Sequence, residues 1–257
     1  MAWHRSRQFE GSLIFRNEDL DPLRCKANLA LAAQADMRWL GLSWEEGPDL
    51  GGPHAPYDQG ARTQSYEAAW RRLLEGGHLF PCRRSRKELR AHAQGLPLAD
   101  PVYPRQWRPQ EPVLHADAPG GDVAWRFRVP LDRAVTFEDA CLGERTFVAG
   151  RDFGDFVVWR RDGVPAYELA VVQDDISMGI TEVVRGEDLL LSTARQILLY
   201  EALGASPPGF FHCPLLRDGG GHKLSKSLGS RSISEHRAAG ADPSAWVEEF
   251  MKAYRSL

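Results

Sequence analysis

Two lysines stand three residues apart in a glycine-led stretch, RDGGGHKLSKSLGS, at positions 217–230. The whole chain has five lysines against 27 arginines, so composition alone gives little reason for the pair Lys223 and Lys226. Glycine N–H groups can approach an anion closely, and a lysine ammonium is a mobile point charge that can follow a phosphate group. Ser225 and Ser227 add hydroxyl donors. The stretch indicates a phosphate-binding loop, although the same residues are equally typical of a solvated surface loop.

The first elements of the chain read as a strand followed by a helix. GSLIFRNED (11–19) has the composition of a strand that ends in acids. Asp21 followed by Pro22 predicts the start of a helix, which Gly41 ends. The apolar face of this helix is expected to contain Leu29, Ala33, Met37 and Leu40.

A second helix is predicted at 61–75, ended by Gly76 and Gly77, and a strand follows at 78–82 (HLFPC). The buried side of the helix is expected to hold Tyr66, Trp70 and Leu73 or Leu74. From 83 to 122 the chain is rich in Arg, Pro, Gly and Ala with little periodicity, which predicts a loop-rich insertion.

The second half continues the alternation of strands and helices. VAWRFRV (123–129) alternates as a half-buried strand does, and 155–175, DFVVWRRDGVPAYELAVVQDD, is expected to form a hairpin-like passage. ITEVVRG (180–186) predicts a strand, and a helix is expected from near Ser192 to Gly204. A last amphipathic helix is predicted because Trp246, Phe250 and Tyr254 recur every four residues. The fold class is therefore α/β.

Composition limits the classes of protein that fit. The 257 residues are 43% hydrophobic and 26% charged with a formal charge of -3, which suits a large globular domain and leaves nucleic-acid binding to a local basic patch. Apolar runs such as AYELAVV are far shorter than the roughly 20 residues of a membrane span, and no secretory signal is recognised, so we expect a cytoplasmic protein. Four scattered cysteines argue against a disulfide framework or an intact metal knuckle.

Several stretches together resemble a known family. HKLSKS (222–227) is similar to the Lys-Met-Ser-Lys-Ser signature of class I aminoacyl-tRNA synthetases. Five further blocks resemble, in order, the catalytic domain of glutamyl-tRNA synthetases: FRNEDLDP (15–22), WLGLSWEEGP (39–48), PAYELAVVQDD (165–175), ITEVVRGEDLL (180–190) and TARQILLYEALG (193–204). The resemblance implies a Rossmann-like parallel sheet in a catalytic domain at 1–82 and 123–230, an insertion subdomain at 83–122, and a C-terminal helical segment at 231–257.

The stretch after the signature decides the branch that the chain resembles. The sequence continues for about 30 residues, without an anticodon-binding domain, as in the stand-alone glutamyl-queuosine tRNA(Asp) synthetases. That resemblance implies ATP-dependent activation of L-glutamate, with Mg²⁺, and transfer to the queuosine base of tRNA(Asp). Two alternatives remain open: a shortened glutamyl-tRNA synthetase that charges tRNA(Glu), and a non-catalytic relative.

The resemblance also assigns roles to single residues. It implies that Lys226 and Lys223 contact ATP and assist catalysis, with His222 beside them. It places Glu18, Tyr167 and Arg185 around glutamate, where a carboxylate would pair with the ammonium and a planar guanidinium with a carboxylate. Each of these three residues has a simpler explanation, respectively an acid at a helix N-terminus, a core aromatic, and an ion pair with Glu187 or Asp188.

Two departures from the family pattern are visible. The chain begins at MAWHRSRQFEG, which resembles the end of the helix after the His-Ile-Gly-His turn, so we expect the first strand and the ATP-binding turn to be missing. Of the family's zinc ligands only Cys82 and Tyr103 match, and Arg84 stands at a cysteine position, so no zinc is expected. The arginines of this segment would contact tRNA phosphates or form a solvated face: Arg83, Arg84, Arg86, Arg90, Arg105 and Arg108.

Overall fold

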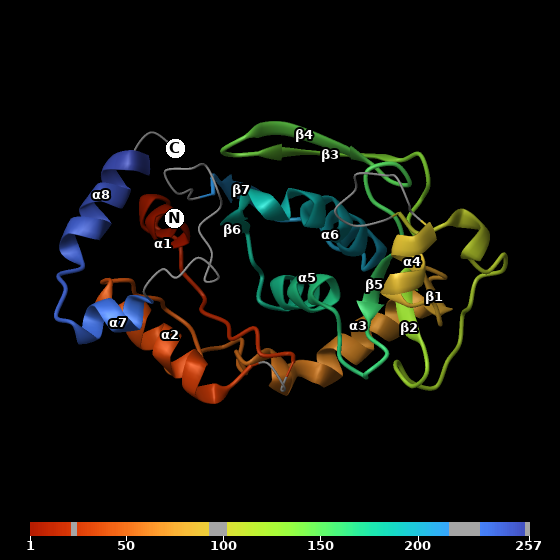
Figure 1. Ribbon diagram of the computed structural model, residues 1–257, viewed down its shortest axis with the longest axis horizontal. Helices are drawn as coiled ribbons and strands as arrows, with labels where there is room; N and C mark the ends of the chain where they lie inside the picture. The colour runs from red at the N-terminus through yellow and green to blue at the C-terminus, as the bar shows by residue number, and fades with distance from the viewer. Residues whose placement is uncertain (22–24, 93–101, 216–231, 255–257) are drawn as a thin grey trace. The chain divides into compact units, whose positions relative to one another are not determined.

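The computed structural model describes residues 1–21, 25–92, 102–215 and 232–254 (Figure 1). The chain separates into two compact units: a first unit of Met1–Gly60 with Cys213–Leu257, and a second unit of Ala61–His212. None of the helices within the described ranges is long and apolar enough to cross a lipid bilayer.

The second unit contains alternating helices and strands, preceded by a 3-10 turn at Gln59–Arg62. Its elements are α3 (Thr63–Glu75), β1 (Leu79–Cys82), α4 (Arg86–His92), η2 (Arg105–Trp107), β2 (Ala124–Phe127), β3 (Ala134–Asp139), β4 (Gly143–Val148), β5 (Phe156–Trp159), α5 (Tyr167–Ser177), β6 (Glu182–Gly186), η3 (Glu187–Leu189), α6 (Leu190–Ala202) and β7 (Gly209–Cys213), whose last residue belongs to the first unit. The predicted strands near 78–82, 123–129 and 180–186 and the helices near 61–75 and 192–204 are thereby confirmed.

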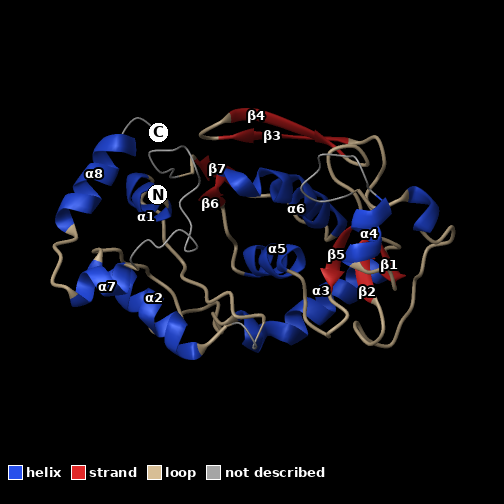
Figure 2. Cartoon of the chain, in the orientation of Figure 1, coloured by secondary structure: helices blue, strands red, loops and turns tan. Residues whose placement is uncertain are grey.

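Two sheets organise the second unit, as Figure 2 shows. The first has the strand order β1-β2-β5, and both pairs are antiparallel. The second has the order β4-β3-β7-β6; β3 pairs with β4 antiparallel and with β7 parallel, through Asp139 opposite Phe210. The α/β class is confirmed, and the sheets that carry it are mixed.

The core of the second unit lies between its helices and these sheets. The predicted inner face of α3 is buried, with Tyr66, Trp70, Leu73 and Leu74 at most 1% exposed. Trp70 meets Trp125 of β2 edge to face at 5.1 Å between ring centroids. α5 packs beside α6, and α6 packs against the β3–β4 hairpin (Figure 1). Each fully buried side chain of this size contributes roughly 1.5–3 kcal/mol to folding.

The first unit is mainly helical. Its helices are α1 (Ala2–Gln8), α2 (Ala27–Trp39), α7 (Ile233–Ala238) and α8 (Ser244–Tyr254), the last of which confirms the predicted C-terminal helix. The Asp36 carboxylate of α2 accepts a hydrogen bond from the Ser234 hydroxyl at 2.8 Å and pairs with Arg237 at 3.2 Å. Trp39 meets Trp246 of α8 edge to face. These contacts join α2 to α7 and α8.

The predicted N-terminal strand is only partly formed. Residues 11–19 make two isolated parallel bridges, Ile14 with Glu46 and Asn17 with Asp58, and no continuous ladder. The expected helix start is wrong, because α2 begins at Ala27. The expected inner face is also wrong in part, since Leu29 is 57% exposed and Gln34 is the one buried residue of α2.

The largest correction concerns the expected hairpin at 155–175. Its first part is confirmed, because strand β5 turns at 160–164 and returns antiparallel, with Trp159 bridged to Pro165 and the Ala166 N–H bonded to the Val158 carbonyl at 2.9 Å. From Tyr167 onward the prediction is wrong, since Tyr167–Ser177 forms helix α5. Five consecutive residues of α5 are buried, Glu168 to Val172, so the segment shows neither helical nor strand periodicity. A short apolar run of this kind is ambiguous, and its neighbours α3 and α6 decide its conformation.

Candidate active site

The residues that the sequence associates with chemistry lie in three parts of the chain. Arg185 is on β6 and Tyr167 is the first residue of α5, both in the second unit, whereas Glu18 belongs to the first unit. His222, Lys223 and Lys226 lie outside the described residues.

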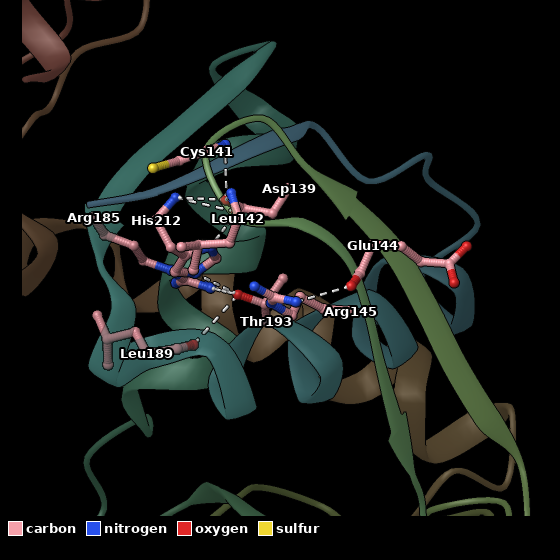
Figure 3. A network of polar contacts seen from close by, with 9 residues as sticks. All are labelled: Asp139, Cys141, Leu142, Glu144, Arg145, Arg185, Leu189, Thr193 and His212. Atoms are coloured by element: carbon pink, nitrogen blue, oxygen red, sulfur yellow. Dashed lines mark hydrogen bonds and ion pairs between the residues drawn. The ribbon is translucent and has the colours of Figure 1, made fainter. Parts of the chain in front are cut away.

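Arg185 is held from two sides by hydrogen bonds (Figure 3). Its Nε donates to Nε2 of His212 at 3.2 Å, and its Nη2 donates to the Thr193 hydroxyl at 2.6 Å. The guanidinium carbon is also 5.9 Å from the centre of the Phe210 ring. These bonds use the Nε/Nη2 edge of the guanidinium plane, and they go to β7 and α6 rather than to Glu187 or Asp188. Nη1 and the second N–H of Nη2 form the other edge, whose geometry suits a carboxylate.

His212 is completely buried and is held on its other side by Asp139. The Nδ1 atom of His212 lies 2.5 Å from the Asp139 carboxylate. Burial lowers the pKa of His212, and this effect, together with the charge of Arg185, exceeds the opposing effect of Asp139 and Asp188. The ring is therefore neutral near pH 7.

Tyr167 and Glu168 begin α5. Tyr167 is 36% exposed, so it is not the core aromatic of the simpler explanation. Glu168 points inward, where it accepts from the Gln196 amide at 2.7 Å and lies 3.9 Å from the Arg195 guanidinium. Burial raises the pKa of Glu168, although Arg195, Gln196 and Arg185 act in the opposite direction. The start of α5 thus places a half-exposed phenol beside a buried carboxyl group.

Glu18 is exposed and follows the two parallel bridges of the N-terminal segment. The first turn of α2 contains no acidic residue, so Glu18 is not the helix-stabilising acid of the simpler explanation. Its neighbour Asp19 instead accepts a hydrogen bond from the Gly60 N–H at 2.8 Å.

The expected remnant of a zinc site consists of two groups that contact each other. Cys82 Sγ lies 3.3 Å from the Tyr103 hydroxyl, and both residues are in a cluster with Phe80 and Leu89. Burial, and then the contact with Cys82, raises the pKa of Tyr103 above its ordinary value, which disfavours the phenolate that a metal would need. Among the described residues no group of three or more His, Cys, Asp or Glu side chains could hold a metal ion.

The six arginines of this segment differ in their surroundings. Arg84 stacks on Trp107 at 4.8 Å and pairs with Glu88, and Arg108 is paired with the buried carboxylate of Asp155. For Arg108, a contact with tRNA phosphates is therefore wrong. Five of the six are exposed, Arg84 among them, together with Arg83, Arg86, Arg90 and Arg105.

His212, Asp139 and Thr193 were not identified from the sequence. One signal was present, because His212 interrupts the apolar run GFFHC with a polar ring. Asp139 ends a strand whose residues alternate between exposed and buried, and it lies 73 residues before His212.

Comparison with known proteins identifies the family. A model of tRNA synthetases class I (E and Q), catalytic domain, matches residues 1–254. The chain belongs to this family. The resemblance to class I glutamyl-type synthetases is thereby confirmed.

Two curated members of the family have the same name. The Glutamyl-Q tRNA(Asp) synthetase of Symbiobacterium thermophilum is 46% identical over 253 residues, covering 96% of this chain and 77% of the relative. The Glutamyl-Q tRNA(Asp) synthetase of Nitratidesulfovibrio vulgaris is 43% identical over 257 residues, covering 98% and 78%. The Glutamate--tRNA ligase of Chlamydia muridarum is 39% identical over 247 residues, covering 94% and 48%.

Solved structures of the family support the class I synthetase fold. The glutamate-tRNA synthetase of Elizabethkingia anophelis matches with a TM-score of 0.75 and 30% identity over 89% of this chain. A glutamate tRNA ligase of Elizabethkingia meningosepticum, solved in complex with its amino acid, matches with a TM-score of 0.74 and 30% identity. The chain spans 48% of each of these two proteins.

Proposed function

We propose that this chain is a ligase that activates L-glutamate with ATP and transfers it to the queuosine base of tRNA(Asp). The observation that carries the proposal is the state of Arg185, whose guanidinium is fixed by His212 and Thr193 along one edge and can bind a carboxylate along the other. Membership of the glutamyl-type family and the names of the two Glutamyl-Q relatives support the substrate.

In the proposed reaction a carboxylate oxygen of glutamate attacks the α-phosphorus of ATP. The bond to the bridging oxygen breaks, so that glutamyl adenylate forms and pyrophosphate leaves. Catalysis of such a step depends on positioning and on stabilising charge at the phosphate oxygens. Lys226 and Lys223, with His222 beside them, would supply that charge, and magnesium would accompany the polyphosphate. The second step transfers the glutamyl group from AMP to queuosine.

Arg185, Tyr167 and Glu18 are the proposed glutamate-binding residues. The exposed carboxylate of Glu18 suits the substrate ammonium, and the half-exposed hydroxyl of Tyr167 is a hydrogen-bonding group at the start of α5. A fixed guanidinium binds a carboxylate with less loss of side-chain freedom than a mobile one, so Arg185 contributes to orientation as well as to charge.

Two activity measurements test this function. The purified protein should catalyse glutamate-dependent ATP–pyrophosphate exchange without tRNA, and then transfer radiolabelled glutamate to tRNA(Asp) that contains queuosine but not to tRNA(Asp) that contains guanine at that position. Labelling of tRNA(Glu) instead would support an ordinary glutamyl-tRNA synthetase, as the name of the Chlamydia relative suggests. Absence of exchange would favour the non-catalytic alternative.

We propose further that the insertion folds without zinc, since Cys82 and Tyr103 contact each other within an apolar cluster. The expected result is that EDTA or 1,10-phenanthroline leaves the melting temperature and the exchange rate unchanged, and that metal analysis finds no stoichiometric zinc. A Cys82→Ala variant should be destabilised by no more than about 2 kcal/mol, because it loses one small buried side chain rather than a metal site. A chelator-induced fall in melting temperature would contradict this proposal.

The exposed basic side chains of α4 are proposed to contact tRNA phosphates. Arg86, Lys87 and Arg90 are exposed, and none forms an ion pair with another residue in the part of the chain that the structure describes. Replacing all three by glutamine should weaken tRNA binding by about 10- to 100-fold near 0.15 M salt and should reduce the slope of log Kd against log salt by about 2–3. The measurement is filter binding across a salt series.

A control variant that loses the same charge elsewhere distinguishes a direct phosphate contact by α4 from a general effect of the protein's positive side chains. In the triple variant Arg71→Gln, Arg133→Gln and Arg151→Gln, three other exposed arginines of the second unit are changed. This variant should retain most of the salt slope. Equal effects of the two triple variants would show that α4 is only a solvated face.

A further inference from the structure

Arg185 fixes the protonation state of the histidine beside it. An arginine Nε can only donate a hydrogen bond, so the hydrogen bond from Arg185 to His212 requires an unprotonated Nε2. The ring proton therefore sits on Nδ1, which faces the Asp139 carboxylate. The Thr193 hydroxyl oxygen lies 2.9 Å from the His212 Nε2 and accepts a second hydrogen bond from Arg185, through Nη2 (Figure 3).

The carboxylate of Asp139 is fixed in turn by backbone groups. Its Oδ1 accepts from the N–H groups of Cys141 at 3.0 Å and Leu142 at 2.9 Å, in the turn between β3 and β4. Both oxygens also lie within 3.2 Å of the His212 N–H in β7. Asp139 is 1% exposed and His212 is fully buried, so neither side chain has room to reorient. The polar chain from the β3–β4 turn to Arg185 is therefore rigid.

We propose that Asp139 and His212 are positioning residues that hold Arg185 in the orientation in which its open edge receives the substrate carboxylate. The inference deepens the proposed function and rests on it. Asp139 selects the Nδ1–H tautomer of His212, and the unprotonated Nε2 then anchors the Arg185 Nε. Neither residue touches the substrate itself. Their effect reaches the reaction only through the guanidinium.

Replacing the Asp139 carboxylate with the amide of asparagine tests the tautomer of His212. In Asp139→Asn, the position of Oδ1 faces the Cys141 and Leu142 N–H groups and requires an oxygen, so the new NH₂ group faces His212 Nδ1. The ring must then carry its proton on Nε2, directed at the Arg185 N–H. The side-chain volume is unchanged, yet the hydrogen bond from the Arg185 Nε to His212 is lost, and Thr193 remains as the second partner.

Two substitutions of His212 test whether an acceptor at the position of Nε2 holds Arg185. In His212→Asn the amide nitrogen lies near the position of Nδ1 and can still donate to Asp139, but no acceptor remains at the position of Nε2 for the Arg185 Nε. In His212→Gln the amide oxygen can reach the position of Nε2 and accept from Arg185. Loss of one hydrogen bond to a charged group corresponds to a change of about 10- to 100-fold.

The expected result is therefore a separation of kinetic constants in pyrophosphate exchange. Asp139→Asn and His212→Asn should raise the KM for glutamate by about 10- to 100-fold and leave the KM for ATP within about twofold. His212→Gln should have a KM for glutamate between that of His212→Asn and that of the wild type. As a control, His78→Asn removes a half-buried ring of the same unit, stacked on Phe127, and should not change the KM for glutamate. Equal changes in both KM values, or no change in any folded variant, would overturn the proposal.

The pH profile provides a readout that a purely structural role would not produce. Protonation of His212 turns Nε2 into a donor, so the wild-type KM for glutamate should rise as the pH falls below the ordinary histidine range, and His212→Gln should lack this rise. In the described part of the unit, the charged groups that act on His212 are Asp139 on β3, Arg185 on β6 and Asp188 in η3. Identical profiles for wild type and His212→Gln would contradict the proposal.

A measurement independent of activity separates the failure of this inference from failure of the proposed function. Long-range ¹H–¹⁵N correlation spectra of the wild-type protein, with the His212 signal assigned from the His212→Gln variant, should show the Nδ1–H tautomer at neutral pH. An Nε2–H tautomer would refute the positioning role even in an active enzyme. Absence of exchange with the Nδ1–H tautomer present would instead refute the proposed function and leave the polar chain intact.

Discussion

Replacing Arg185 by lysine should lower kcat/KM for glutamate in pyrophosphate exchange by about 100- to 1,000-fold, because the two charge-assisted hydrogen bonds that we propose for the substrate carboxylate would be lost. A lysine ammonium is a single donor group without a plane. It cannot satisfy His212 and Thr193 along one edge and present a second edge to a carboxylate. Retention of the positive charge therefore should not rescue the activity.

A matched change at another arginine provides the control for Arg185→Lys. Arg133 is 46% exposed and pairs with Glu201 at 2.7 Å in the same unit, so Arg133→Lys should leave kcat/KM within about twofold. Far-ultraviolet circular dichroism and the melting temperature would establish that both variants are folded. An Arg185→Lys enzyme with nearly wild-type kcat/KM would show that the open edge of the guanidinium does not bind the substrate.

The sequence predicted those elements whose periodicity is unambiguous. The buried face of α3 is visible as a pattern and is present in the structure. Strand β2 is also present, but its predicted alternation is wrong, because Arg126 is buried together with Trp125 and Phe127. Helix α5 was assigned wrongly because its apolar residues form a short continuous run, which is compatible with a strand or a helix. Packing against α3 and α6 favours the helix. The β3–β4 hairpin was missed although β3 alternates strictly, since its exposed positions hold Ala134, Thr136 and Glu138 among many polar neighbours.

For the candidate site, the ordered motifs identified residues but not the geometry that supports them. Arg185 and Tyr167 were found because each lies in a motif with a recognisable order, while His212 and Asp139 occur in no such motif. Their partnership spans 73 residues and depends on the pairing of β3 with β7, which brings Asp139 opposite Phe210. A contact created by strand register cannot be read from local spacing.

Asp155→Asn should have the largest effect on stability, lowering the free energy of unfolding by about 3–5 kcal/mol. The Asp155 side chain is fully buried and receives two hydrogen bonds from Arg108, whose side chain is 10% exposed. It also accepts from the Val129 N–H at 2.9 Å. An asparagine would direct its amide group toward a buried guanidinium or toward the Val129 N–H, so a buried charge or a buried donor would lose its acceptor. The measurement is urea unfolding monitored by tryptophan fluorescence.

The surface pair Arg160–Asp162 gives the matched control, because Asp162 is 53% exposed and its replacement by asparagine should cost at most about 1 kcal/mol. The difference in stability between Asp155→Asn and Asp162→Asn would measure how strongly the Arg108–Asp155 pair holds the insertion. Arg108 follows η2, whose Trp107 packs on the cluster of Phe80, Cys82 and Tyr103, so the Arg108–Asp155 pair joins the insertion to the residue that precedes β5. If Asp155→Asn unfolds at the same urea concentration as Asp162→Asn, the insertion is held by its apolar cluster alone.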